Sequence, residues 1–226
     1  MSVIPAPLEA VLFDLDGTLV DTADEFVLVV QALRAEHNLG PMDADIIRSL
    51  VSNGSWTLAK VALGLDESHP ELAAKRERLL ELYTEVLGTV AKPYPGITDL
   101  LAELARRNIP WGLVTNKPRA YAEPLMETLN FNPAPACMVC PDDVTDTKPH
   151  PEPLYLACKQ IDCLPHRCIY VGDHVRDIDA GRGAGMYTIA ACYGYIETGD
   201  DPSKWGADAS VDHSTELLSA LFKTAE

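Results

Sequence analysis

Residues 11–22 have the sequence VLFDLDGTLVDT, in which a hydrophobic strand ends in two aspartates and a turn at glycine. Because strand side chains alternate between faces, Asp14 and Asp16 begin on the same side of the predicted strand. Ligands of open α/β sheets bind outside the carboxyl ends of the strands, where this pair lies. Two carboxylates so close repel each other unless a cation joins them or one is protonated. The stretch therefore predicts a site for a divalent metal ion, which prefers oxygen ligands.

Composition and charge narrow the class of protein. Of the 226 residues, 47% are hydrophobic and 23% are charged, which is ordinary for a globular protein of one domain plus an insertion. The formal net charge of −16 argues against non-specific binding to nucleic acid or to an anionic membrane. No stretch is long enough for a membrane span, and residues 1–7 lack the features of a signal peptide, so we expect a cytoplasmic protein.

The six cysteines are interpreted as small buried hydrophobic residues in a reducing compartment. Cys137 and Cys140 have the C-x-x-C spacing of many zinc sites, but they lie in a strand-like run with no second pair at ligand spacing. The other four lie in or beside apolar stretches, at Cys158, Cys163, Cys168 and Cys192.

Two kinds of pattern divide the chain. Residues 21–92 are predicted to be almost entirely helical, with Thr22-x-x-Glu25 as a capping box at their start. After a turn-rich joint at 93–96, strands and helices alternate to the end, which is typical of a parallel sheet covered on both faces. We therefore predict a Rossmann-like, three-layer α/β/α core of residues 1–20 and 93–226, with an α-helical cap domain inserted at 21–92.

Polar residues follow four of the predicted strands. Taken singly, each group has an ordinary explanation as a helix cap, a turn or a solvated loop. Because the carboxyl ends of parallel strands share one edge of a sheet, we expect the four groups to converge. The groups are Asp14 with Asp16, Thr115 with Asn116, Lys148 in a proline-stiffened loop, and Asp173 with Asp177.

These four motifs and the helical insertion resemble the haloacid dehalogenase superfamily, whose members are mostly phosphatases, across residues 8–190. The resemblance implies that Asp14 is a nucleophile that forms an aspartyl-phosphate and that Asp16 is the general acid and then the general base. It implies Mg²⁺ held by the carboxylates of Asp14 and Asp173 and the backbone carbonyl of Asp16, with Asp177 acting nearby or through water. The dehalogenases of the superfamily lack the second aspartate, so Asp16 favours phosphate ester chemistry.

The resemblance also implies a phosphate-binding set of Thr115, Asn116 and Lys148, together with backbone N–H groups near Leu15 and Asn116. Positive charge is needed because like charges about 4 Å apart repel by roughly 4 kcal/mol at an effective dielectric of about 20. A purely structural ion pair with an aspartate is the alternative for Lys148. His174 is interpreted as a loop residue, with a contact to the ligands of the metal ion as the alternative.

In relatives with a helical cap, the loop between early cap helices faces the substrate. That loop here is 52–55, with Asn53, Gly54 and Ser55 as candidate contacts. It carries no charge, which suits a neutral polyol or sugar better than a small carboxylate, although Arg48 or Lys60 nearby would alter this. A simple interhelical turn is the alternative.

Segments 123–126, 140–144, 151–159 and 172–178 look like the phosphoglycolate phosphatase group. Segments 193–196 and 205–208 are similar to the N-acetylmuramic acid 6-phosphate phosphatases of peptidoglycan recycling. We therefore expect a Mg²⁺-dependent phosphatase whose partner is a small phosphorylated metabolite, N-acetylmuramic acid 6-phosphate. The first alternative is a 2-phosphoglycolate phosphatase or a broader small-sugar phosphatase.

Three further alternatives stay open. A phosphonate hydrolase would need a cap lysine, Lys60 or Lys75, in an apolar pocket. A β-phosphoglucomutase would need the cap to hold a second phosphate, and the uncharged cap loop argues against it. A non-catalytic binding protein on the same fold would be expected to have lost Asp14 or Asp16.

Overall fold

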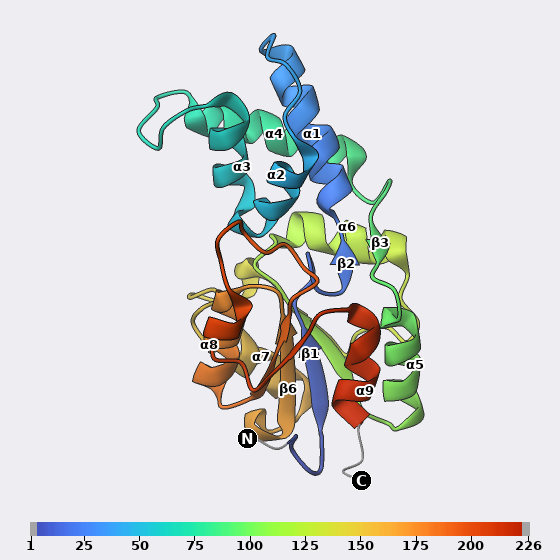
Figure 1. Cartoon of the computed structure of the whole chain (residues 1–226). Helices are drawn as coiled ribbons and strands as arrows, with labels where there is room; N and C mark the ends of the chain where they lie inside the picture. Colours follow the sequence, from blue (N-terminus) through green and yellow to red (C-terminus); the bar gives the residue numbers. More distant parts are fainter. Residues whose placement is uncertain (1–3, 223–226) are drawn as a thin grey trace.

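The computed structural model describes residues 4–222, and a six-stranded sheet forms its centre (Figure 1). The strands are β1 (Ala10–Phe13), β4 (Trp111–Val114), β5 (Cys137–Val139), β6 (Cys168–Gly172), β7 (Tyr187–Ala191) and β8 (Ala209–Val211). Their order is β5-β4-β1-β6-β7-β8, and every neighbouring pair is parallel. The predicted α/β fold class is confirmed.

Strand β1 lies inside the sheet because all four of its residues are apolar, and each is fully buried. It pairs with β4 on one side and with β6 on the other. A parallel strand that is covered on both faces has this continuous apolar sequence. The residues that follow the three strands, Asp14, Thr115 and Asp173, therefore leave the sheet at the same edge.

Helices cover both faces of the sheet, and the alternation of side chains along β1 shows which helices cover which face. Val11 and Phe13 belong to a hydrophobic cluster with α5, α6 and α9, whereas Ala10 and Leu12 belong to a cluster with α7 and α8 (Figure 1). The predicted three-layer arrangement is present. These helices are α5 (Ile97–Arg106), α6 (Arg119–Leu129), α7 (Glu152–Ile161), α8 (Val175–Ala184) and α9 (Leu217–Phe222), with short 3₁₀ helices η2 (Pro141–Asp143), η3 (Pro165–Arg167), η4 (Pro202–Lys204) and η5 (Ser214–Glu216).

The chain between β2 (Val20–Asp21) and β3 (Lys92–Pro93) forms a helical unit with its own hydrophobic cluster. Its elements are α1 (Ala23–Glu36), α2 (Ala44–Ser49), η1 (Val51–Asn53), α3 (Gly54–Leu63) and α4 (Leu72–Val86). Strands β2 and β3 pair antiparallel, so the chain enters and leaves this unit through a two-stranded ribbon. Figure 1 shows the helical unit beyond the edge of the sheet to which β1 and β6 point. Within residues 4–222, no helix is both long and apolar enough to cross a membrane.

The start of α1 differs from the predicted capping box. Thr22 directly precedes the helix, but its hydroxyl donates to Asp16 Oδ1 at 2.6 Å and caps no backbone N–H. The Glu25 carboxylate accepts the N–H of Ala91 at 3.2 Å, where the chain leaves the helical unit. The capping-box prediction was therefore wrong, because tertiary contacts use both side chains.

Candidate active site

Lys148 joins residues of several predicted motifs at the carboxyl edge of the sheet. Its Nζ lies 3.0 Å from Asp14 Oδ1 and 2.7 Å from Asp177 Oδ1, and its side chain is fully buried. It also donates to the carbonyl oxygen of Val114, at 3.0 Å, and to the hydroxyl of Tyr170, at 2.8 Å. A buried ammonium with this many partners fixes the positions of both carboxylates.

Asp14, Asp173 and Asp177 form a buried carboxylate cluster whose oxygens lie within 4.8 Å of one another. Asp173 accepts hydrogen bonds from neutral donors, including the Tyr195 N–H at 2.9 Å and the Ser52 hydroxyl at 3.1 Å. Burial, and then the negative charges of Asp14 and Asp177, raise the pKa of Asp173 to about 7. Lys148 pairs with Asp14 and Asp177, and the charge of Arg176 also acts on Asp173 and Asp177, so three ionised carboxylates still leave an excess negative charge that a divalent cation would offset. The all-oxygen donor set fits such an ion.

Gly17 makes room for this cluster. Its φ of +79° is unfavourable for a residue with a side chain, and a Cβ here would overlap Asp173 Oδ2. The glycine of the opening motif is therefore required by its own turn and by a carboxylate that follows β6.

Lys117 belongs to the site, although the sequence analysis gave it no role. Its Nζ lies 2.9 and 3.2 Å from the two carboxylate oxygens of Asp16 and 2.7 Å from the hydroxyl of Tyr83. Burial alone would lower the pKa of Lys117, but the charges and hydrogen bonds of Asp16 and Tyr83 outweigh it and raise that pKa. The available signal was its position, two residues after Thr115 at the end of β4.

The predicted phosphate-binding residues lie together at this edge. The Thr115 hydroxyl accepts the N–H of Lys117 at 3.1 Å, and the Asn116 amide donates to the carbonyl of Lys148 at 3.0 Å. The N–H of Leu15 donates to Asp14 Oδ1 at 2.7 Å. Thr115 and Asn116 line the same pocket as Asp14 and Asp16, whereas Lys148 does not line that pocket. A direct contact of Lys148 with phosphate therefore stays a prediction.

The pocket, of about 310 Å³, lies between the sheet edge and the helical unit. From the helical unit it is lined by the predicted loop 52–55 and by Arg76 of α4, and from the core side by Arg176 of α8. The predicted loop itself carries no charge, but the pocket as a whole also contains the guanidiniums of Arg76 and Arg176. Helix α4 follows the loop by many residues in the sequence, so the loop alone did not reveal this charge.

Arg76 and Arg176 keep their charges available. Arg76 Nε donates to the Ser55 hydroxyl at 2.8 Å, and its guanidinium lies 4.7 Å above the Trp56 ring centroid. Arg176 donates to the Ser52 carbonyl at 2.5 Å, and its buried Nε has no hydrogen-bond partner within residues 4–222. In that same part of the chain, neither guanidinium forms an ion pair with a carboxylate.

Comparison with known proteins now identifies the family. The family model described as haloacid dehalogenase-like hydrolase matches residues 11–191. The chain belongs to the haloacid dehalogenase-like hydrolases. The predicted family is thus confirmed.

The relatives of this hydrolase include phosphatases of two named activities. An N-acetylmuramic acid 6-phosphate phosphatase of Pseudomonas aeruginosa is 46% identical over 214 residues, which are 95% of each chain. A phosphoglycolate phosphatase of Xanthomonas campestris is 37% identical over 211 residues, 92% of this chain and 94% of the other. The crystal structure of a predicted phosphoglycolate phosphatase from Haemophilus somnus matches with a TM-score of 0.83 at 23% identity, over 95% of this chain and 98% of the other, and shows the same fold.

The lysines and the arginine that the sequence analysis suggested for the cap side of this hydrolase do not line the pocket. Lys60 pairs with Glu67 at 2.9 Å, and Lys75 pairs with Glu71 at 3.4 Å. Arg48 pairs with Asp24. Lys117 lines the pocket instead, and its ammonium is already bound by Asp16 and Tyr83.

His174 caps α8 of the hydrolase. Its imidazole Nδ1 accepts the backbone N–H of Arg176 at 3.1 Å, and its backbone N–H donates to Asp177 Oδ2 at 3.1 Å. Burial, and then the charge of Arg176, lower the pKa of His174 to about 4. A neutral imidazole that accepts this bond holds the helix start, and with it Asp177, in place.

Proposed function

We propose that this hydrolase is a Mg²⁺-dependent phosphatase that cleaves a phosphomonoester through an aspartyl-phosphate on Asp14. The observation that carries the proposal is the position of Asp14. It lines the pocket, contacts the ammonium of Lys148 at 3.0 Å, and belongs to the carboxylate cluster with Asp173 and Asp177. Phosphatase activity agrees with the family and with the named relatives.

The carboxylates of Asp14 and Asp173 and the backbone carbonyl of Asp16 would hold Mg²⁺, with Asp177 in contact or through water. When bound, the ion supplies positive charge to the phosphoryl group and offsets its repulsion from Asp14. Lys148 carries part of that charge compensation, because it contacts Asp14 and Asp177 at once.

Asp14 and Asp16 would divide the chemistry between them. A carboxylate oxygen of Asp14 attacks phosphorus while the ester P–O bond breaks, and Asp16 gives its proton to the leaving oxygen. Asp16 then takes a proton from the water that attacks phosphorus and releases phosphate from Asp14. Thr115 and Asn116 line the pocket beside Asp14 and would hold phosphate oxygens.

Residues 21–92 would act as the cap domain on a core of 1–20 and 93–226. Asn53, Gly54 and Ser55 of the loop 52–55 line the pocket from this side and would contact the substrate. Closing the pocket with these residues would exclude bulk water while the intermediate forms.

For the substrate we propose N-acetylmuramic acid 6-phosphate, a small metabolite of peptidoglycan recycling, handled in the cytoplasm. Two observations support it. A relative of that name shares 46% identity over 95% of the chain. The guanidiniums of Arg76 and Arg176, unpaired with carboxylates within residues 4–222, suit a sugar phosphate that also carries a carboxylate, as muramic acid does through its lactyl group. The second candidate, 2-phosphoglycolate, also carries a carboxylate and is favoured by the 37%-identical relative.

The test is phosphate release from three substrates with Mg²⁺: N-acetylmuramic acid 6-phosphate, N-acetylglucosamine 6-phosphate and 2-phosphoglycolate. The second has the same sugar without the lactyl carboxylate. We expect the highest kcat/KM for the first, loss of activity with a chelator, and at least about a thousandfold lower kcat in Asp14→Asn. A higher kcat/KM for 2-phosphoglycolate would overturn the proposed substrate. Equal rates of wild type and Asp14→Asn would overturn the proposed role of Asp14 as the nucleophile.

A further inference from the structure

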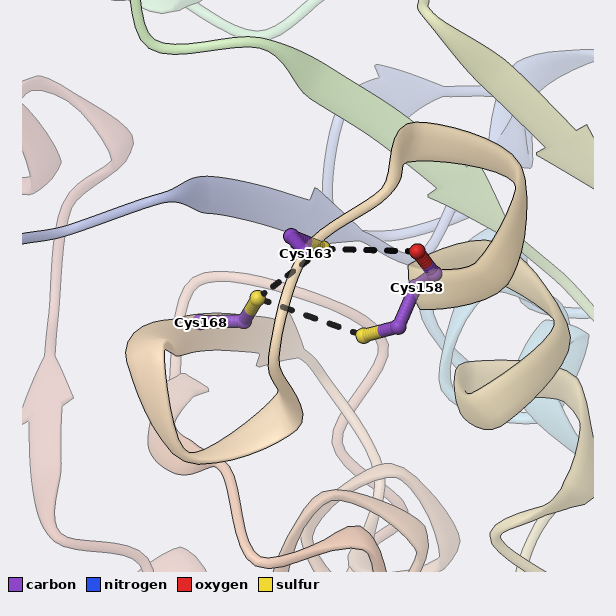
Figure 2. Close-up of side chains that lie close together, drawn as sticks. All are labelled: Cys158, Cys163 and Cys168. Atoms are coloured by element: carbon purple, nitrogen blue, oxygen red, sulfur yellow. Dashed lines mark hydrogen bonds between the residues drawn. The ribbon is translucent and has the colours of Figure 1, made fainter.

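Three cysteine side chains lie close together beside the amino end of β6 (Figure 2). Cys158 belongs to α7, Cys163 lies in the loop after it, and Cys168 is the first residue of β6. Asp173 follows the far end of the same strand, roughly 16 Å away at about 3.3 Å per residue. The thiols are therefore separate from the carboxylate cluster of the pocket.

The three sulfurs converge. Sγ of Cys168 lies 3.3 Å from Sγ of Cys163 and 4.0 Å from Sγ of Cys158, and all three sulfurs lie within 4.8 Å of one another. An ion bound to three sulfurs at about 2.3 Å separates them by roughly 3.8–4.0 Å. The two printed distances lie on either side of this range or at its limit, so small rotations of the thiols would bring the sulfurs to the spacing that such an ion needs.

We propose that Cys158, Cys163 and Cys168 form a trithiolate site for one soft, thiophilic cation such as Zn²⁺. Sulfur ligands select soft ions over Mg²⁺, so the two ends of the sheet would hold ions of different kinds. The sequence interpretation treated these cysteines only as small hydrophobic residues. Two of them, Cys158 and Cys168, are indeed buried, whereas Cys163 is half-buried and provides access for the ion.

The surrounding chain holds the cluster in position. In the loop between Cys163 and Cys168, the N–H of Leu164 donates to Glu9 Oε2 at 2.9 Å, and Arg167 pairs with Glu9 Oε1 at 2.7 Å. The segment that carries two of the ligands is thus anchored to the start of the core before any ion binds. A bound ion would clip the end of α7 to the start of β6.

Protons compete with the ion for this site. Each thiol that binds releases its proton to solvent, so three protons leave for one divalent ion. We therefore expect binding to tighten as the pH rises.

The test is titration of the reduced protein with Co²⁺, a coloured substitute for Zn²⁺, followed by displacement with Zn²⁺. We expect one Co²⁺ per chain to give sulfur-to-cobalt charge-transfer absorption, which ions on the carboxylates of the pocket cannot produce. The absorption should disappear in Cys163→Ser and persist in Cys192→Ser, a matched control because Cys192 is half-buried outside the cluster.

No charge-transfer absorption in the wild type, or its persistence in both Cys163→Ser and Cys158→Ser, would overturn the proposal. Mass spectrometry of protein prepared without reductant tests the competing chemistry. An added peroxide would oxidise two thiols to a disulfide and take up both thiol hydrogens. A disulfide between Cys163 and Cys168, together with no metal uptake after reduction, would overturn the metal site in favour of a redox pair.

Discussion

The ammonium of Lys117 lies 2.9 Å from a carboxylate oxygen of Asp16, in a pair that is largely buried. It also donates to the hydroxyl of Tyr83 on α4, at 2.7 Å. One lysine therefore connects the proposed proton-transfer residue to the helical unit. The pairing gives a role to Lys117, to which the sequence analysis assigned none.

Lys117→Met should lower kcat by about tenfold to a hundredfold, because Asp16 loses the partner that orients it and proton transfer contributes about a hundredfold or more. Steady-state kinetics with the preferred substrate measures this. Tyr83→Phe should have a smaller effect, since it removes one of the partners of Lys117. The control variant Lys75→Met should match wild type, because Lys75 does not line the pocket and pairs with Glu71. An unchanged kcat in Lys117→Met would show that the pair is only structural.

Arg76→Gln should lower kcat/KM for N-acetylmuramic acid 6-phosphate by about tenfold to a hundredfold, since a hydrogen bond to a charged group contributes about 1.5–3 kcal/mol. The rate on N-acetylglucosamine 6-phosphate, which lacks the carboxylate, should change little. Arg78→Gln is the matched control, because Arg78 lies on the same helix and pairs with Glu36. Equal losses on both substrates would mean that Arg76 only supports the loop at Ser55.

Gly17→Ala should abolish most phosphatase activity and weaken metal binding, because the new Cβ overlaps the Asp173 carboxylate. Gly185→Ala separates strain from overlap. Gly185 has a φ of +76°, close to that of Gly17, but a Cβ there meets no atom within 4 Å. We expect Gly185→Ala to lose about 1 kcal/mol of stability at full activity. Isothermal titration with Mg²⁺ and denaturant unfolding measure the two effects, and equal Mg²⁺ affinity in both variants would contradict the prediction.

Glu25→Gln should make folding stability less dependent on pH. Burial raises the pKa of Glu25 above 4.5, so the folded protein holds this proton more tightly than the unfolded chain. The free energy of unfolding therefore falls as pH rises from 4.5 through the raised pKa, and Glu25→Gln removes that part of the decrease. Glu36→Gln should act with the opposite sign, since Arg78 lowers the pKa of Glu36. Urea unfolding at several pH values checks both slopes, and parallel curves for wild type and Glu25→Gln would refute the assignment.

The sequence alone was sufficient for the family, the parallel α/β core and the convergence of Asp14, Asp173 and Lys148. These features depend on local patterns. A continuous apolar run forms a buried strand such as β1, and residues that follow parallel strands share one edge of the sheet. Hydrophobic periodicity likewise indicated the helices between β2 and β3.

Tertiary structure alone decided the partners of individual side chains. Thr22 and Glu25 satisfied a capping pattern, but contacts with Asp16 and Ala91 replaced it. Arg76 entered the pocket because α4 packs against α1 and α3, and no local spacing encodes that contact. The cysteine sulfurs met because α7 and β6 pack together. Hydrophobic patterns specify which face of an element is buried, whereas the neighbours of a polar side chain depend on how distant elements pack.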